Sequence, residues 1–192
     1  MGSASNTRIV LGIDPGMAIV GYAVVEARGD ELSMITCDVI TTPAGMPLAQ
    51  RLQLIYRGLG EIIATYRPNE AAMEELFFAK NARTALTVGQ ARGVAMLALA
   101  NGGLSIAEYT PLQVKQAVTG YGSAKKDQVG EMVRILLHIP SIPRPDDAAD
   151  AAAVAICHLH TARYALQLGF PTTQDDTSHG YPVTEDPSLR SG

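Results

Sequence analysis

Residues 8–16 read RIVLGIDPG, a short apolar run that ends in one carboxylate and a Pro-Gly pair. An apolar run of this length closed by turn residues is typical of a buried central strand. Pro15 fixes φ and Gly16 permits a reversal of the backbone, so the chain must turn directly after Asp14. Asp14 therefore lies at the edge of a sheet, either as part of an acidic site or as an acid that only hydrogen-bonds its own turn.

The segment after this turn has the composition of a β-hairpin. Residues 19–26 and 32–42 are rich in β-branched side chains, and Gly29-Asp30 lies between them. Such a pair of runs around a Gly-Asp turn predicts two antiparallel strands. The chain therefore opens with three antiparallel strands.

Helical spacing begins after the hairpin. Apolar residues recur every three or four positions from Pro47, and Pro68 requires this helix to stop near Arg67. The apolar segment 71–76, which contains Glu74, predicts a fourth strand. The later elements expected are a helix over 82–100 after the N-cap Asn81, a strand over 104–109, a helix that begins at Thr110-Pro111 and breaks at Gly120, an amphipathic helix over 125–137, and a final alanine-rich helix over 146–168.

This order of elements indicates an α/β protein with a mixed five-stranded sheet and helices on both faces. The length of 192 residues suits one domain, which we place at residues 8–168. Residues 1–7 are small and polar and are expected to form a disordered leader. Residues 169–192 contain few apolar side chains and are expected to form a disordered tail.

The composition is that of a water-soluble globular protein, with 47% hydrophobic and 18% charged residues. No apolar run approaches the roughly 18 residues that a membrane span needs, and no signal peptide is recognisable, so we expect a cytoplasmic protein. Cys37 and Cys157 stand in neither a metal-ligand nor a redox spacing, which favours free thiols.

The net charge of −4 hides an uneven distribution. Residues 80–134 have more Lys and Arg than Asp and Glu, whereas the segment after Pro171 has an excess of acids. A basic middle segment with acids elsewhere is typical of a face that binds a polyanion beside an acidic site.

Four acids are expected at the ends of elements, namely Asp14, Glu74, Asp147 and Asp150. Asp147 and Asp150 are three residues apart in the first turn of the last helix, so they share a helix face. Acids in a first turn also occur simply because they complement the helix dipole. Glu74 stands within an apolar strand, where a buried carboxylate needs a partner. Glu75 points to the opposite face and is the solvated alternative.

Convergence of these acids would require divalent cations to offset their mutual repulsion. Carboxylate oxygens are ligands for Mg²⁺ or Mn²⁺, and no His or Cys cluster competes for this role. Two such ions about 4 Å apart would support in-line phosphodiester hydrolysis. His158 lies about 16 Å along the helix from Asp147 and is interpreted as a packing residue.

Several motifs together resemble one family. They are GIDPG (12–16), MEELF (73–77), AKNA (79–82), LTVGQARGVA (86–95), QVKQAVTGYGSAKK (113–126) and DDAADA (146–151). Their joint occurrence in this order resembles the RuvC family of bacterial Holliday junction resolvases. The resemblance implies a ribonuclease H-like fold and a homodimeric, Mg²⁺-dependent endonuclease that nicks four-way DNA junctions symmetrically.

The resemblance also implies roles for the acids. Asp14 and Glu74 match the first and second catalytic and metal-binding carboxylates, and Asp147 and Asp150 match the last pair. Asp146 is an additional acid relative to the family pattern, and whether it shares in metal binding stays open.

Candidate DNA-binding residues follow from the same motifs. Phe77 matches an aromatic residue that stacks on a junction base, with a plain core position as its alternative. Lys115 and Lys126 match basic residues that contact backbone phosphate beside the active site. Lys125 is a further candidate in the same glycine-punctuated loop as Lys126. Arg83 and Arg92 on the long helix are weaker candidates, whose alternative is that they merely solvate that helix.

A homodimer would present two copies of one site to two strands of a junction with two-fold symmetry. We hypothesise that the long helix over 82–100 packs at the dimer interface through its small residues Gly89, Ala91, Gly93 and Ala95. The resemblance further implies the RuvAB branch-migration complex as a partner.

Three alternatives remain at the level of sequence. The first is a junction-binding module whose acids do not cleave. The second is an actin-like or sugar-kinase-like ATPase, although such folds need two lobes. The third is a ribonuclease H-like nuclease that acts on RNA or on single strands.

Overall fold

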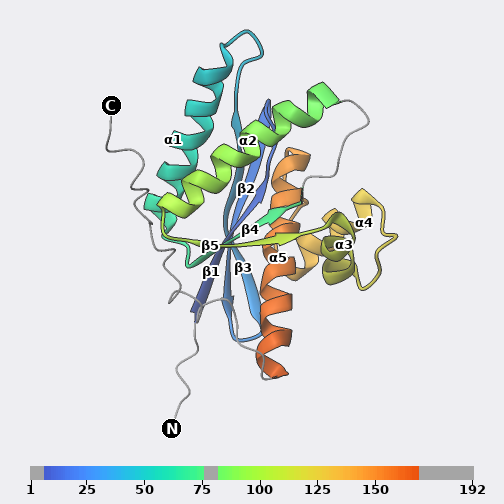
Figure 1. The fold of residues 1–192 in the computed structure, drawn as a ribbon. Coiled ribbons are helices and arrows are strands. Elements are labelled where there is room, and N and C mark those ends of the chain that lie inside the picture. Colours follow the sequence, from blue (N-terminus) through green and yellow to red (C-terminus); the bar gives the residue numbers. More distant parts are fainter. Residues whose placement is uncertain (1–6, 76–81, 169–192) are drawn as a thin grey trace, which may run out of the picture.

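The sheet has five strands in the order β3-β2-β1-β4-β5 in the computed structural model, which describes residues 7–75 and 82–168 (Figure 1). β1, β2 and β3 pair in antiparallel fashion, and β4 and β5 continue the sheet in parallel with β1. This is the mixed five-stranded sheet that the sequence predicts. The strand bounds are β1 Thr7–Asp14, β2 Ile19–Arg28, β3 Glu31–Thr41, β4 Glu70–Glu74 and β5 Ser105–Tyr109.

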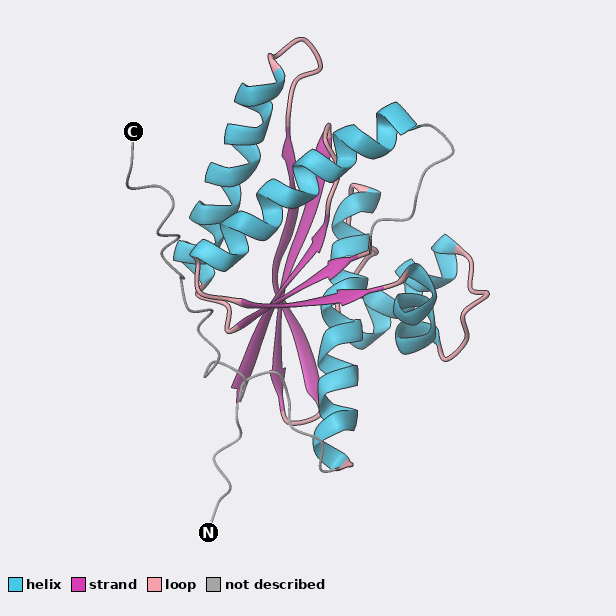
Figure 2. Ribbon diagram, viewed as in Figure 1, coloured by secondary structure: helices cyan, strands magenta, loops and turns pink. Residues whose placement is uncertain are grey.

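Helices cover both faces of this sheet (Figure 2). The helices α1 and α2 pack together on one face, and α5 lies on the other face with α3 and α4 beside it. Their bounds are α1 Leu48–Tyr66, α2 Ala82–Asn101, α3 Pro111–Thr119, α4 Lys126–Leu136 and α5 Asp146–Gln167. None of the helices in the described ranges is long and apolar enough to cross a membrane.

Local signals explain where the helices begin and end. α1 ends before Pro68, and Arg67 takes a left-handed conformation with φ of 47°. The side chain of Thr110 accepts a hydrogen bond from the backbone N–H of Gln113 at 3.2 Å and so caps α3. α3 ends at Gly120, whose φ of 86° is readily adopted only by glycine.

The two sides of the sheet bury different sets of residues. Leu11 and Ile13 of β1 pack under α1 and α2, whereas Val10 packs toward α5. Because side chains alternate along a strand, even-numbered positions of β1 face α5. The same alternation places Ala72 of β4 on the α5 side and Met73 on the other side.

α5 lies unusually close to the sheet. A methyl group added to Gly12 would lie 2.2 Å from the carbonyl oxygen of Ala151, and one added to Gly21 would lie 2.0 Å from that of Asp147. Most of the helix surface that meets the sheet is alanine, and these alanines are buried. Small residues on both sides thus let the first turns of α5 approach β1 and β2 directly.

The buried stripe of α2 includes Ala91, Ala95 and Leu99, which pack against the sheet and α1. The proposed role of Ala91 and Ala95 in a dimer interface is therefore wrong, because residues four apart share a helix face and this face points into the core. Gly93 lies on the exposed side of α2.

The ends of the domain differ only slightly from the expectation. Thr7 already belongs to β1, one residue before the expected start. The predicted disordered leader, apart from Thr7, and the predicted tail lie outside the described residues. Cys37 and Cys157 are free thiols, as expected.

Candidate active site

Asp14 and Glu74 lie side by side at the ends of two neighbouring parallel strands. Ile13 pairs with Met73 in the parallel register of β1 and β4, so the next residue of each strand is an acid. Neighbouring strands are about 4.8 Å apart. Both acids have the parity of the α5 face, and both are half-buried. Glu75, on the opposite face, is exposed.

The first turns of α5 bring two further acids to this edge. Asp147 and Asp150 are half-buried and share the side of α5 that faces the sheet. The backbone of Asp147 lies against Gly21, which pairs with Asp14 in the β1–β2 ladder. The close approach of α5 is therefore what places these acids beside Asp14.

The four carboxylates influence one another electrostatically. Burial, first, and then the negative charges of Asp150, Glu74 and Asp147 together raise the pKa of Asp14 to about 7, against the opposing charge of Lys126. Burial and the charge of Asp150 also raise the pKa of Glu74, while Lys115 and Lys126 lower it. Acids that raise one another's pKa in this way lack sufficient compensating positive charge.

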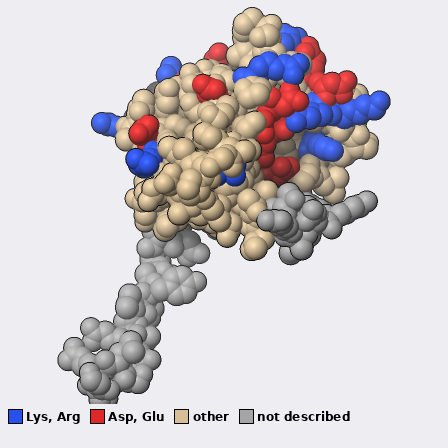
Figure 3. Space-filling model, turned by 90° about the horizontal axis from the view of Figure 1, so that it is seen from above, with Lys and Arg blue, Asp and Glu red and all other residues tan. Residues whose placement is uncertain are grey.

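Two lysines lie on one side of the acids. Lys126 Nζ is 2.8 Å from Asp150 Oδ2, and this hydrogen bond raises the pKa of Lys126. Lys115 and Lys126 line a pocket of about 210 Å³ together with Glu74 and Asp150, which we call the basic pocket. Figure 3 shows acidic side chains gathered in one hollow of the surface with Lys and Arg side chains beside it.

The acids suit a divalent cation in their chemistry, because each offers hard carboxylate oxygens. As arranged, no group of three or more His, Cys, Asp or Glu side chains within residues 7–75 and 82–168 could hold a metal ion. The ammonium group of Lys126 lies against one oxygen of Asp150. Lys126 therefore supplies part of the positive charge that the acids need.

Asp146 is directed toward basic side chains. Its Oδ1 accepts a hydrogen bond from Arg144 Nη1 at 2.6 Å, and its Oδ2 lies 3.6 Å from Lys126 Nζ. The charges that raise the pKa of Asp14 come from Asp150, Glu74 and Asp147. Asp146 thus bridges two cations at the outer edge of the acid group.

Arg92 braces the end of β4, a role that the sequence does not reveal. Its Nη1 donates a hydrogen bond to the backbone carbonyl of Glu74 at 2.8 Å, and its guanidinium also forms an ion pair with Glu108 of β5. The Arg92 side chain is only 12% exposed. Arg92 therefore fixes the position of Glu74 instead of merely solvating α2.

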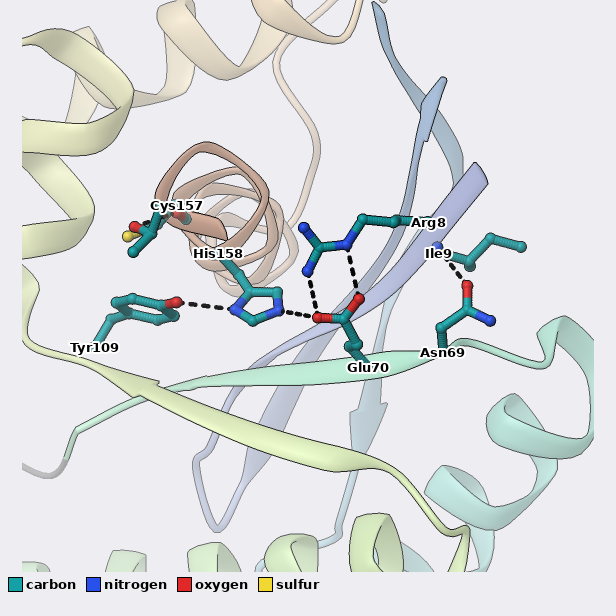
Figure 4. A network of polar contacts seen from close by, with 8 residues as sticks. Arg8, Ile9, Asn69, Glu70, Tyr109, Cys157 and His158 are labelled. Carbon is teal, nitrogen blue, oxygen red and sulfur yellow. Dashed lines mark hydrogen bonds and ion pairs between the residues drawn. The ribbon is translucent and has the colours of Figure 1, made fainter. Parts of the chain in front are cut away.

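A second polar network lies between the sheet and α5 (Figure 4), and its carboxylate, Glu70, is at the other end of β4 from Glu74. Glu70 is 1% exposed and accepts hydrogen bonds from Arg8 Nε at 2.8 Å and Arg8 Nη2 at 2.5 Å. His158 Nε2 lies 2.7 Å from the same carboxylate, and His158 Nδ1 lies 2.8 Å from the hydroxyl of Tyr109.

The charge of Glu70 is well satisfied in this network. Burial alone would raise the pKa of Glu70, but hydrogen bonds from His158 and Arg8 and the charges of both residues outweigh it and lower the pKa to about 2. His158 is thus a buried structural residue, as its position on the helix indicates. Because side chains alternate along a strand, Glu70, four residues before Glu74, lies on the same face of β4. This alternation is the sequence signal that could identify Glu70.

The candidate DNA-binding residues are only partly described. Phe77 and the side chain of Arg83 lie outside the described residues. Lys125 is exposed directly before α4, next to Lys126. Lys115 is half-buried on α3.

The fold is of the ribonuclease H-like class. Its sheet has three antiparallel strands continued by two parallel ones, and its carboxylates lie at the ends of β1 and β4 and at the start of α5. Residues 10–158 match the family model described as crossover junction endodeoxyribonuclease RuvC. The chain belongs to the RuvC family. This result removes the ATPase alternative.

Curated relatives cover nearly the whole domain. The crossover junction endodeoxyribonuclease RuvC of Chloroflexus aurantiacus is 60% identical over 159 residues, which cover 83% of this chain and 97% of the relative. The protein of the same name from Caldanaerobacter subterraneus is 53% identical over 161 residues, covering 84% and 98% of the two chains.

Solved structures agree with this assignment. Thermus thermophilus RuvC is 36% identical with a TM-score of 0.76, over 82% of this chain and 97% of that chain. The same protein in complex with a Holliday junction substrate is 34% identical, also with a TM-score of 0.76, over 82% and 96% of the chains. The yeast mitochondrial Holliday junction resolvase Ydc2, at 15% identity and a TM-score of 0.60 over 80% and 79% of the chains, shares the fold.

Proposed function

We propose that this chain is a crossover junction endodeoxyribonuclease that resolves four-way DNA junctions during recombination and repair. Hydrolysis of the phosphodiester takes place at Asp14, Glu74, Asp147 and Asp150. The observation that carries this proposal is the grouping of these acids, in which the pKa of Asp14 is raised to about 7. Membership of the RuvC family and the adjacent lysines support it.

The acids hold divalent metal ions in this proposal, with Mg²⁺ as the physiological ion, Mn²⁺ accepted, and two ions in each site. When bound, such ions lower the pKa of a water molecule and stabilise the leaving oxygen of an in-line displacement. Asp14 must lose its proton to act as a ligand, so metal binding is coupled to proton release. Lys126 must also release Asp150.

The lysines then serve the DNA. Once Lys126 has left Asp150, its ammonium group remains in the basic pocket with Lys115, where both can contact the phosphates that flank the scissile bond. Asp146, which also pairs with Arg144, lies 3.6 Å from the ammonium group of Lys126 and attracts its charge.

We also propose a homodimer that packs through the outer surface of α1 and α2. Leu86 and Leu97 of α2 are 67% and 53% exposed, and Tyr56 of α1 adds a further exposed apolar side chain. A groove of about 600 Å³ between the two helices is lined by Leu52, Tyr56 and Leu97, among other residues. Exposed apolar area of this kind is typical of a protein interface. A monomer by light scattering at working concentration would contradict the dimer.

Partnership with the RuvAB branch-migration complex and a cytoplasmic location stay predictions that rest on the family.

The test is strand cleavage of a labelled synthetic four-way junction, compared with linear duplex, single-stranded DNA and RNA. Each substrate is incubated with Mg²⁺, with Mn²⁺ and with chelator. Paired symmetric nicks in the junction that require metal are the expected result. Junction binding without cleavage under every condition would instead indicate a non-catalytic binding module, and cleavage of single strands or RNA alone would overturn the proposed substrate.

A further inference from the structure

A second pocket lies on the other side of the acid group from the basic pocket. It has a volume of about 480 Å³ and is formed by the turn between β1 and β2, the N-terminal half of α2 and the start of α5. The residues that line it are Gly16, Met17, Ala18, Ile19, Thr87, Val88 and Asp147. We call it the apolar pocket. Of the four acids, Asp147 is the one that lines this pocket.

The two pockets differ in charge. The basic pocket contains Lys115 and Lys126, which attract phosphate. Among the described residues that line the apolar pocket, none is Lys or Arg, and the one charged side chain is the carboxylate of Asp147. A phosphate group would be repelled there and would also lose its hydration against apolar walls. The uncharged part of a nucleotide meets no such penalty.

The walls of the apolar pocket are held in place before any ligand arrives. The backbone N–H of Thr42 donates a hydrogen bond to the carbonyl of Ala18 at 2.8 Å. Arg51 Nη2 donates to the carbonyl of Met17 at 3.1 Å, and the hydroxyl of Thr42 donates to the same oxygen. A fixed turn loses little conformational entropy when a ligand binds, which favours discrimination between similar ligands.

We propose that the apolar pocket is a nucleobase subsite, which receives the base or nucleoside next to the scissile phosphate and thereby sets a sequence preference for cleavage. This proposal rests on the proposed function. A strand whose scissile phosphate lies at the acids has one neighbouring nucleotide on each side. The phosphate on one side is drawn to the basic pocket, and the nucleoside on the other side enters the apolar pocket.

The geometry also indicates how the base is read. Met17, Ala18, Ile19 and Val88 offer apolar contacts to the face or methyl group of a base. The pocket is large enough to hold a nucleoside. Discrimination at this subsite therefore comes from the contacts that its apolar walls make with the base, and filling the pocket or trimming a wall should alter it.

The experiment uses the full chain and a set of four-way junctions that differ only in the base pair on one or the other side of the scissile phosphate. The nicking rates of junctions that carry each of the four bases at a given position are compared, and the ratio of the fastest to the slowest rate is the preference ratio. Junction binding is measured separately at fixed salt. Ala18→Phe fills the pocket. Ala18 is exposed, and the hydrogen bond that its backbone carbonyl accepts from Thr42 does not involve its side chain. Val88→Ala enlarges the pocket. Ala64→Phe is the control, because Ala64 is exposed near the C-terminal end of α1 and does not line the pocket.

The expected result is that Ala18→Phe reduces the preference ratio about fivefold or more at one position and leaves the ratio on the other side of the scissile phosphate unchanged. Val88→Ala removes an apolar contact and should also change the ratio at that same position, and Ala64→Phe should change neither ratio. Unchanged ratios in both pocket variants would overturn the proposal, as would an equal change in the control. Absence of nicking by the unaltered chain would contradict the proposed function instead.

Discussion

Gly21→Ala tests whether the close approach of α5 to β2 is what positions the acids. Gly21 pairs with Asp14, and it also lies against the backbone of Asp147. Adding one methyl group here changes no charge and removes no hydrogen bond. Any effect must therefore come from the distance between the sheet and the first turn of α5.

The size of the displacement follows from the structure. The new Cβ would lie 2.0 Å from the carbonyl oxygen of Asp147, whereas real Cβ contacts are not shorter than 3.0 Å. The start of α5 must therefore move away by about 1 Å. A misplacement of about 1 Å in catalytic groups can lower the rate about 100-fold. Overpacking of this kind costs about 1 to 3 kcal/mol of stability, which leaves an ordinary domain folded.

The assay measures the single-turnover nicking rate on a four-way junction at several Mg²⁺ concentrations, together with urea unfolding of the same preparation. We expect a rate about 100-fold below that of the unaltered chain, with most molecules folded. Gly60→Ala is the control, because no atom lies within 4 Å of the added methyl group. It should raise stability by about 0.5 to 1 kcal/mol and leave the rate unchanged.

A Gly21→Ala protein that is folded and nicks at the normal rate would refute this reasoning. The acids would then tolerate displacement of α5, and their position could not depend on the glycine contact. A protein that does not fold would call for Gly21→Ala to be combined with Gly60→Ala, which offsets part of the lost stability.

Three further predictions concern individual carboxylates. Asp14→Asn should bind junctions but not nick them in gel assays. The pKa of Asp14 is raised from 3.8 to about 7, so the metal-free unaltered chain should lose stability as pH rises from about 4 to 7. At pH 8, urea unfolding should therefore show that Asp14→Asn is about 2 to 4 kcal/mol more stable than the unaltered chain. Glu70→Gln should lower the free energy of unfolding by about 3 to 5 kcal/mol at pH 7, because it leaves Arg8 without its buried partner. The pKa of Glu70 is about 2 in the folded chain and near 4.5 in the unfolded chain, so the stability that its charge contributes is complete above pH 4.5 and is lost as pH falls toward 2. Asp146→Asn should leave the Mg²⁺ concentration for half-maximal nicking unchanged, whereas Asp150→Asn should raise it; equal shifts would make Asp146 a ligand.

Much of the fold could be predicted because the decisive signals are local. Pro68 and Gly120 mark helix ends by their backbone preferences, Thr110 marks a helix start by its side-chain cap, and the structure confirms each. The acids at the ends of β1 and β4 could be assigned to one edge because each follows a strand of known direction.

The contacts that hold the site could not be predicted in the same way. Arg92 reaches the carbonyl of Glu74 only because α2 crosses the sheet near that strand end, and no sequence spacing encodes this crossing. The ion pair between Lys126 and Asp150 likewise depends on how α4 meets α5. Such contacts between distant segments follow from packing and become visible only in three dimensions.

For a different reason, the sequence does not reveal the buried Glu70. Pro68 and Asn69 before it indicate a loop, so the pattern predicts a strand that begins one residue later. Its partners Arg8 and His158 are far from it in the sequence.

The position of α5 in the chain has a consequence for synthesis. Two of the four carboxylates stand in its first turns, after about three quarters of the sequence, and they reach Asp14 only when the alanine face of α5 has settled on Gly12 and Gly21. A growing chain on the ribosome that has not yet completed α5 thus holds only two of the four site carboxylates, Asp14 and Glu74, and cannot form the complete site. A nuclease arranged in this way is harmless to the chromosome until its own folding is almost complete.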